Sequence, residues 1–104
     1  MNLFDNIPAQ LTEELTSVLQ EGKGVRIERI VSKGHRSPDA FWYEQEPDKW
    51  LVLLYGAAML EFEDRTERFA PGDYIHIPAQ TPYRVLWTTP DEPTVWLTVV
   101  FGQA

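Results

Sequence analysis

The sequence predicts an all-β fold, an antiparallel sandwich or barrel, with one α-helix in front of it. Short apolar segments are separated by Gly, Pro and Asp about every 8–12 residues after Gly24, which is the spacing of strands joined by tight turns. Residues 25–31 alternate apolar and charged side chains, as a half-buried strand does. The chain has 104 residues, enough for one domain with a single hydrophobic core.

The predicted helix covers residues 5–21. Its start signals are Asp5 or Asn6 as the cap and Pro8 in the first turn. Its apolar side chains recur at helical spacing, at Leu11, Leu15, Val18 and Leu19. Gly22 and Gly24 would end it. We therefore expect a helical segment over residues 1–24, packed on a barrel of residues 25–104, the two together forming one domain.

The other predicted strands lie between turn residues such as Pro47, Gly56 and Gly72. They cover residues 41–43, 50–55, 58–63, 66–69, 74–77, 83–88 and 95–101. Residues 50–55 are apolar almost throughout, which predicts a strand covered on both faces.

Composition excludes several classes of function. The formal net charge is −7, which argues against nucleic acid or an anionic membrane as a partner, because phosphate binding needs clustered Lys and Arg. The absence of cysteine excludes disulfides, thiolate metal sites and thiol nucleophiles. No signal-peptide pattern or long apolar run is present, so we expect a cytoplasmic protein that does not enter a membrane.

The segment from Gly72 to Tyr83 resembles the second sequence motif of the cupins, which are small jelly-roll barrels. That motif places Gly, Pro, Gly, His and Asn at fixed spacing, and this chain supplies Gly72 and Pro78 in register. Its remaining positions are occupied by Gln80, Tyr83 and Trp87. Further blocks within residues 25–101 are similar to a subgroup of uncharacterised small bacterial cupins. The resemblance implies an antiparallel jelly-roll β-barrel.

The first cupin motif supplies the other metal ligands of the family, two His and a Glu, and closes on a Gly. With Gly56 in that place, Lys49 stands at the Glu position, and residues 42–45 replace the two-His stretch without a histidine. Ligand positions of cupins face into the barrel. The resemblance therefore implies that four side chains share one cavity as ligand-binding residues: Tyr43, Gln45, Lys49 and Tyr83.

These residues are a poor donor set for a divalent transition metal, which prefers imidazole and carboxylate. We therefore expect no metal cofactor, unless a different alignment of the first motif makes Glu44 or Glu46 a ligand. Lys49 beside two tyrosines suits a small, possibly anionic molecule, through a carboxylate, a phosphate or sugar hydroxyls.

Two alternatives remain open. One is an enzyme of the isomerase, epimerase or dioxygenase type, either metal-dependent or using Lys49 for proton transfer. The other is a pocket without function, in which Lys49 pairs with a neighbouring Glu and the tyrosines fill the barrel. The sequence assigns no catalytic residue, because it contains no Gly-x-Ser-x-Gly elbow or phosphate-binding glycine loop.

The two histidines are expected outside the binding set. His76 lies in a short strand on the same face as Tyr74, where we expect packing or hydrogen bonding, and His35 lies in a polar loop. Small cupins generally form homodimers, and Trp50 and Trp96 are candidates for the interface because aromatic residues are enriched there.

Overall fold

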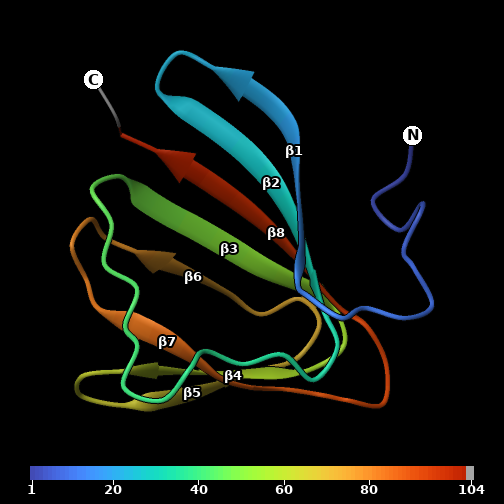
Figure 1. Ribbon diagram of the computed structural model, residues 1–104. Coiled ribbons are helices and arrows are strands. Elements are labelled where there is room, and N and C mark those ends of the chain that lie inside the picture. The colour runs from blue at the N-terminus through green and yellow to red at the C-terminus, as the bar shows by residue number, and fades with distance from the viewer. Residues whose placement is uncertain (103–104) are drawn as a thin grey trace.

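The computed structural model describes residues 1–102, which form an all-β domain (Figure 1). Within that range there are eight strands: β1 Leu15–Gly22, β2 Val25–Ser32, β3 Asp48–Tyr55, β4 Ala58–Phe62, β5 Thr66–Phe69, β6 Tyr74–Ile77, β7 Tyr83–Thr88 and β8 Thr94–Phe101. These residues include no helix long and apolar enough to cross a membrane.

The strands form two antiparallel sheets. The larger has the order β1-β2-β8-β3-β6 and the smaller the order β5-β4-β7. Figure 1 shows the five-stranded sheet lying above the three-stranded sheet, and the hydrophobic core fills the space between them. Leu53 of β3 and Leu60 of β4 meet in this core and are almost fully buried.

The predicted helix over residues 5–21 is wrong, because its second half forms β1, an edge strand paired with β2. Gly22 and Gly24, which predicted a helix end, instead make the tight turn of the β1–β2 hairpin, where Gly24 adopts a positive φ of 75°. The apolar stripe does not pack on a core either, since Val18 and Leu19 are exposed. Pairing with β2 satisfies backbone groups that would otherwise lie on a bare sheet edge.

The segment that joins β2 to β3 is a loop rather than the predicted strand over residues 41–43. It runs beside β7 (Figure 1), and only Tyr43 makes a β-bridge, with Tyr83. The two backbones exchange hydrogen bonds of 2.7 and 3.0 Å. Closer to β2, the amide of Ser37 donates to the carbonyl of Val85, and the Ser37 hydroxyl accepts from the Val85 amide. These bonds hold the loop, and with it Tyr43, against the open end of the barrel.

Candidate functional site

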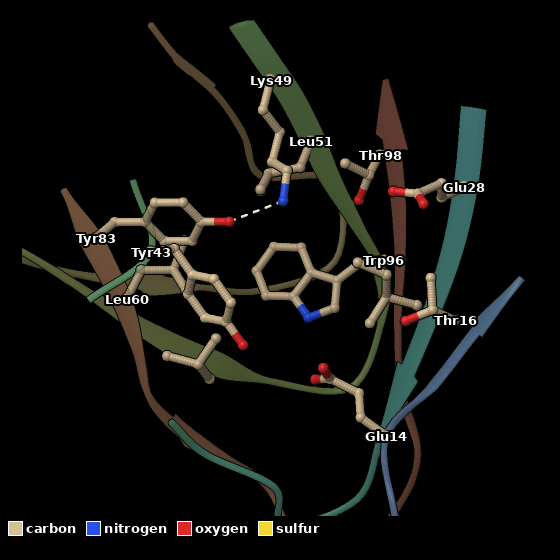
Figure 2. Close-up of a pocket in the computed structure, with 12 residues that line it drawn as sticks. Glu14, Thr16, Glu28, Tyr43, Lys49, Leu51, Leu60, Tyr83, Trp96 and Thr98 are labelled. Atoms are coloured by element: carbon tan, nitrogen blue, oxygen red, sulfur yellow. Dashed lines mark hydrogen bonds between the residues drawn. The ribbon is translucent and has the colours of Figure 1, made fainter. Parts of the chain in front are cut away.

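A cavity of about 230 Å³ lies between the two sheets. It is lined by the twelve residues drawn in Figure 2: Glu14, Thr16, Glu28, Ile30, Tyr43, Lys49, Leu51, Leu60, Tyr83, Val85, Trp96 and Thr98. The inner end is closed by buried side chains, whereas Glu14, Thr16 and Tyr43 are partly open to solvent. The cavity is therefore a pocket with a mouth between β1 and the β2–β3 loop.

Strand alternation explains how these side chains reach one space. Residues two apart on a strand point to the same face, so β3 contributes Lys49 and Leu51, and β8 contributes Trp96 and Thr98. The register then aligns the strands, since Thr98 lies opposite Glu28 of β2 and opposite Leu51 of β3. The five-stranded sheet thus presents an acidic residue, a hydroxyl and an amine to the same cavity.

Lys49 and Tyr83 form the central polar contact. The ammonium group of Lys49 donates a hydrogen bond of 2.8 Å to the phenolic oxygen of Tyr83, drawn as a dashed line in Figure 2. Tyr83 is only 4% exposed, and its ring stacks on that of Tyr43 at a centroid distance of 5.3 Å. The contact joins the two sheets, because Lys49 belongs to the larger and Tyr83 to the smaller.

Burial governs the ionisation of this pair. It lowers the pKa of Lys49 from the ordinary value of 10.5, although the nearby carboxylate of Glu28 acts in the opposite direction. Burial also raises the pKa of Tyr83 well above 10.0, and Glu14 and Glu28 add to this effect. The pKa of Tyr43 is raised by the same cause and by Glu14. Both tyrosines are therefore neutral hydroxyls near neutral pH.

The opposite wall of the cavity carries acceptors. Figure 2 shows Glu28 and Thr98 on the side of the cavity away from Tyr83, and the indole of Trp96 in the middle of the view. Glu14 lies below the indole, near the mouth of the cavity. One carboxylate oxygen of Glu28 lies 3.1 Å from the guanidinium of Arg26. Glu14 accepts a 2.5 Å hydrogen bond from the hydroxyl of Ser32. The cavity thus contains one amine and two carboxylates.

The structure brings together three of the four residues that the sequence predicted as pocket contacts. Tyr43, Lys49 and Tyr83 line the same cavity, whereas Gln45 is not among the lining residues. The backbone carbonyl of Gln45 accepts a 2.7 Å hydrogen bond from the amide of Gln80. The side-chain nitrogen of Gln45 is buried and has no hydrogen-bond partner among the residues described.

Sequence reasoning missed the acidic wall. In residues 25–31 the apolar positions suggested the buried face, yet the alternate positions, with Glu28 and Ile30, point into the cavity. Glu14 falls within the predicted helix over residues 5–21, and instead it lies just before β1 at the mouth of the cavity. The sequence did contain one signal for this second buried face of β2. Ile30 is apolar although it lies on the otherwise polar face, and a strand with apolar residues on both faces is usually buried on both.

The lining residues do not fit a divalent transition metal. No imidazole reaches the cavity, and the amine at the expected Glu position already donates to Tyr83. Within residues 1–102 no three side chains of the His, Cys, Asp or Glu type gather as a metal site would require. Glu44 and Glu46, the alternative ligands, are exposed and do not line the cavity.

The sequence also singled out two histidines and one tryptophan whose positions the structure shows. His76 is on the outer face of the large sheet, stacked on Phe101 at 5.8 Å. The Nδ1 atom of His35 accepts a 2.9 Å hydrogen bond from the amide of Lys33, which shapes the loop. Trp96 is 5% exposed and lines the cavity, so it does not lie on a surface that a second copy could contact.

The chain belongs to the cupin family, since a sequence profile described as Cupin domain matches residues 27–100. The fold, the strand order and the internal cavity agree with this assignment. The expected jelly-roll class of structure is therefore supported at the level of an all-β, antiparallel cupin fold.

Solved structures give the same result. The chain is 41% identical to a protein from Ralstonia eutropha JMP134 described as a candidate mannose-6-phosphate isomerase, with a TM-score of 0.95 and coverage of 99% of this chain and 97% of that one. It is 19% identical to a cupin superfamily protein from Desulfitobacterium hafniense DCB-2 (TM-score 0.77, coverage 93% and 84%). It is 22% identical to the polyketide cyclase RemF from Streptomyces resistomycificus (TM-score 0.73, coverage 88% and 67%). A comparison with curated proteins gives no significant match.

Proposed function

We propose that this cupin binds a small polar molecule in its barrel cavity, with the Lys49–Tyr83 pair in the place of a metal centre. The observation that carries the proposal is the 2.8 Å hydrogen bond between Lys49 and Tyr83 inside the cavity. The ammonium retains further hydrogens to donate, and the hydroxyl of Tyr83 retains its own. Both donors are thus available to an acceptor group of a ligand, such as a carboxylate, a phosphate or a sugar hydroxyl.

The walls of the cavity favour a ligand with an apolar middle. Leu51, Leu60 and Val85 alternate with the polar groups, and the indole of Trp96 offers a flat surface. An apolar cavity with a few convergent polar groups is the usual form of a small-molecule site. We therefore assign to Lys49, Tyr43 and Tyr83 the role of ligand contacts.

The cavity has a volume of about 230 Å³ and opens to solvent at its mouth, so its size alone does not define the ligand. The description of the Ralstonia protein names a phosphorylated hexose. We do not carry that activity over to this chain, because one fold hosts many unrelated functions.

Proton transfer by Lys49 is the second candidate function. Burial lowers the pKa of Lys49, which brings an amine closer to the range of a general base, and Tyr83 lies within hydrogen-bond distance of it. If this function holds, a ligand with an acidic C–H bond exchanges that hydrogen for deuterium in heavy water. The exchange, followed by NMR, disappears in Lys49→Arg, while unchanged exchange in that variant rules out Lys49 as the base.

A thermal-shift screen tests the binding proposal. Purified protein is screened against small carboxylates, amino acids, polyols and phosphates, and each stabilising compound is then titrated calorimetrically into wild type, Lys49→Met and Tyr83→Phe. We expect binding to weaken by about tenfold or more in Lys49→Met, since a hydrogen bond to a charged group contributes about 1.5–3 kcal/mol. Near-UV circular dichroism confirms that each variant is folded.

The matched control is Lys23→Met. Lys23 lies in the exposed turn between β1 and β2, away from the cavity, so this variant removes the same charge without touching the pocket. We expect it to bind as wild type does. A stabilising compound that binds equally well to Lys49→Met, Tyr83→Phe and Lys23→Met contradicts the proposal.

A further inference from the structure

The cavity holds charges of both signs that do not pair with each other. Within residues 1–102, Lys49 forms no salt bridge and donates instead to the neutral hydroxyl of Tyr83. The Glu28 side chain is 12% exposed and pairs through one oxygen with Arg26, which leaves its other oxygen without a charged partner. Buried charges are costly unless they are paired and hydrogen-bonded. A molecule bound between Lys49 and Glu28 would supply the opposite charge that each of these side chains lacks.

Thr98 provides an independent sign of a missing partner. It is 0% exposed and lines the cavity, yet its hydroxyl oxygen has no hydrogen-bond partner among the residues described. Buried hydroxyls in native proteins almost always have one. Thr98 lies opposite Glu28 in the strand register, so the two side chains offer acceptor oxygens at the same place.

The register also sets the separation of the two polar walls. Lys49 is on β3 and Glu28 on β2, and β8 lies between these strands. Lys49 lies opposite Val100 and Glu28 opposite Thr98, so two strand spacings of about 4.8 Å and an offset of two residues place their backbones about 12 Å apart. Figure 2 shows the amine of Lys49 and the carboxylate of Glu28 on the same side of the Trp96 indole, with Thr98 between them. A short chain of methylene groups that joins the two head groups would pass beside Thr98 and the indole.

On these observations, and resting on the proposed function, we propose that the ligand is a small zwitterion. Its carboxylate accepts hydrogen bonds from Lys49 and Tyr83, and its ammonium donates to Glu28 and Thr98. The methylene groups between them contact Trp96. Such a ligand supplies an opposite charge to each wall of the cavity.

Charge complementarity disfavours the other ligand classes. A dianion places its second negative charge against Glu28 and near Glu14, and a dication places a positive charge against Lys49. A neutral polyol can donate and accept hydrogen bonds, but it supplies no counter-charge to Lys49 and none to the second carboxylate oxygen of Glu28. The zwitterion alone matches both walls.

Four probes of similar length test this assignment: γ-aminobutyrate as the zwitterion, succinate as the dianion, putrescine as the dication and erythritol as the polyol. Each is titrated into the wild-type chain by calorimetry at neutral pH. We expect γ-aminobutyrate to bind at least about tenfold more tightly than the other three. Tighter binding of any other probe, or no binding of γ-aminobutyrate, overturns the assignment.

Two variants locate the contacts. Glu28→Gln should weaken γ-aminobutyrate about tenfold and strengthen succinate, because it removes the negative charge that repels the second carboxylate. Glu21→Gln is the matched control, since Glu21 is exposed near the end of β1 and does not line the cavity, and it should bind all four probes as wild type does. Equal effects of Glu28→Gln and Glu21→Gln on γ-aminobutyrate contradict the inference.

These outcomes separate the inference from the function on which it rests. If a polyol or a dicarboxylate binds more tightly and is lost in Lys49→Met, the zwitterion is wrong and the binding function stands. The same conclusion follows if none of the four probes binds but a compound from the thermal-shift screen does and is lost in Lys49→Met. If no compound depends on Lys49, the binding function itself fails.

Discussion

The ammonium of Lys49 donates to the phenolic oxygen of Tyr83 across the interior of the barrel, at 2.8 Å. In the cupin motifs these are the positions of a Glu and a His, both metal ligands. Both side chains face the interior of the barrel and line one cavity. We infer that this donor pair occupies the place where the motifs would position ligands for a cation.

The buried hydroxyl of Tyr83 predicts a specific dependence of stability on alkaline pH. Its pKa is raised above 10.0, so the unfolded chain loses this proton first and the free energy of unfolding falls as pH rises above about 10. The contribution is about 1.4 kcal/mol per pH unit at most. Urea unfolding of Tyr83→Phe between about pH 9 and 11 should show a flatter decline than wild type, and an equally steep decline contradicts the burial of this group.

Lys49 has the opposite effect on how the free energy of unfolding depends on pH. Its pKa is lowered in the folded state, so the unfolded chain binds more protons between that folded-state pKa and 10.5, and stability rises with pH in this window. Lys49→Met removes the rise and should make the alkaline decline steeper than in wild type. A decline that Lys49→Met makes flatter would show that the amine is not desolvated.

Gly56 and Gly72, which anchor the two cupin motifs, are predicted to differ in their tolerance of alanine. Both have positive φ, 94° and 95°, but a Cβ at Gly56 would lie 2.7 Å from the backbone of Pro93 and Thr94, whereas nothing lies within 4 Å at Gly72. We expect Gly72→Ala to cost about 1–2 kcal/mol from backbone strain. Gly56→Ala should cost at least about 3 kcal/mol, since rigid backbone must also move. Equal losses in chemical denaturation contradict this account.

Gln80 predicts a stabilising substitution. It occupies the second glycine position of the motif and retains a positive φ of 60°, which a residue with a Cβ adopts at a cost. Gln80→Gly should raise the free energy of unfolding by about 0.5–1 kcal/mol after the greater flexibility of the unfolded chain is included. The backbone hydrogen bond to Gln45 is unaffected by the change. Gln80→Ala, which keeps a Cβ, should show no such gain, and a similar gain in both variants argues against strain at this position.

We propose that a second copy of the chain covers the outer face of the five-stranded sheet. Trp50 and Tyr74 lie together on this face, with ring centroids 5.7 Å apart, and Tyr74 is 67% exposed. Tyr74→Glu would bury a charge in such a contact and should shift the chain from dimer to monomer in sedimentation velocity. Trp87→Glu, on the smaller sheet, is the control and should leave the dimer intact. A wild-type chain that sediments as a monomer contradicts the proposal.

Most strands could be predicted from the sequence because turn residues mark their ends. The ranges 50–55, 66–69, 74–77 and 83–88 agree closely with β3, β5, β6 and β7. The error at β1 has a physical cause. Leu15, Val18 and Leu19 fit a helical stripe, and the register shift of β1 between Val18 and Gln20 disturbs the two-residue alternation that would have indicated a strand. Pairing with β2 is a tertiary contact that no local pattern reports.

The site was predictable only in part for a similar reason. Motif spacing places Lys49 and Tyr83 in the barrel, and the structure brings both to one cavity. Glu28 and Thr98 lie outside both motifs, and they meet because β2 and β8, far apart in the sequence, pair in one particular register. Alternation separates the two faces of a strand, but it does not tell which polar face lines a cavity.

Metal content tests the central claim most directly, namely that Lys49 and Tyr83 have replaced the metal centre of the family. The protein is purified without an affinity tag and without chelators. Its iron, manganese, nickel and zinc contents are then measured by inductively coupled plasma mass spectrometry. The account predicts far less than one metal ion per chain for each of them. A transition metal that co-purifies at close to one ion per chain, and is lost in Tyr83→Phe, would contradict it.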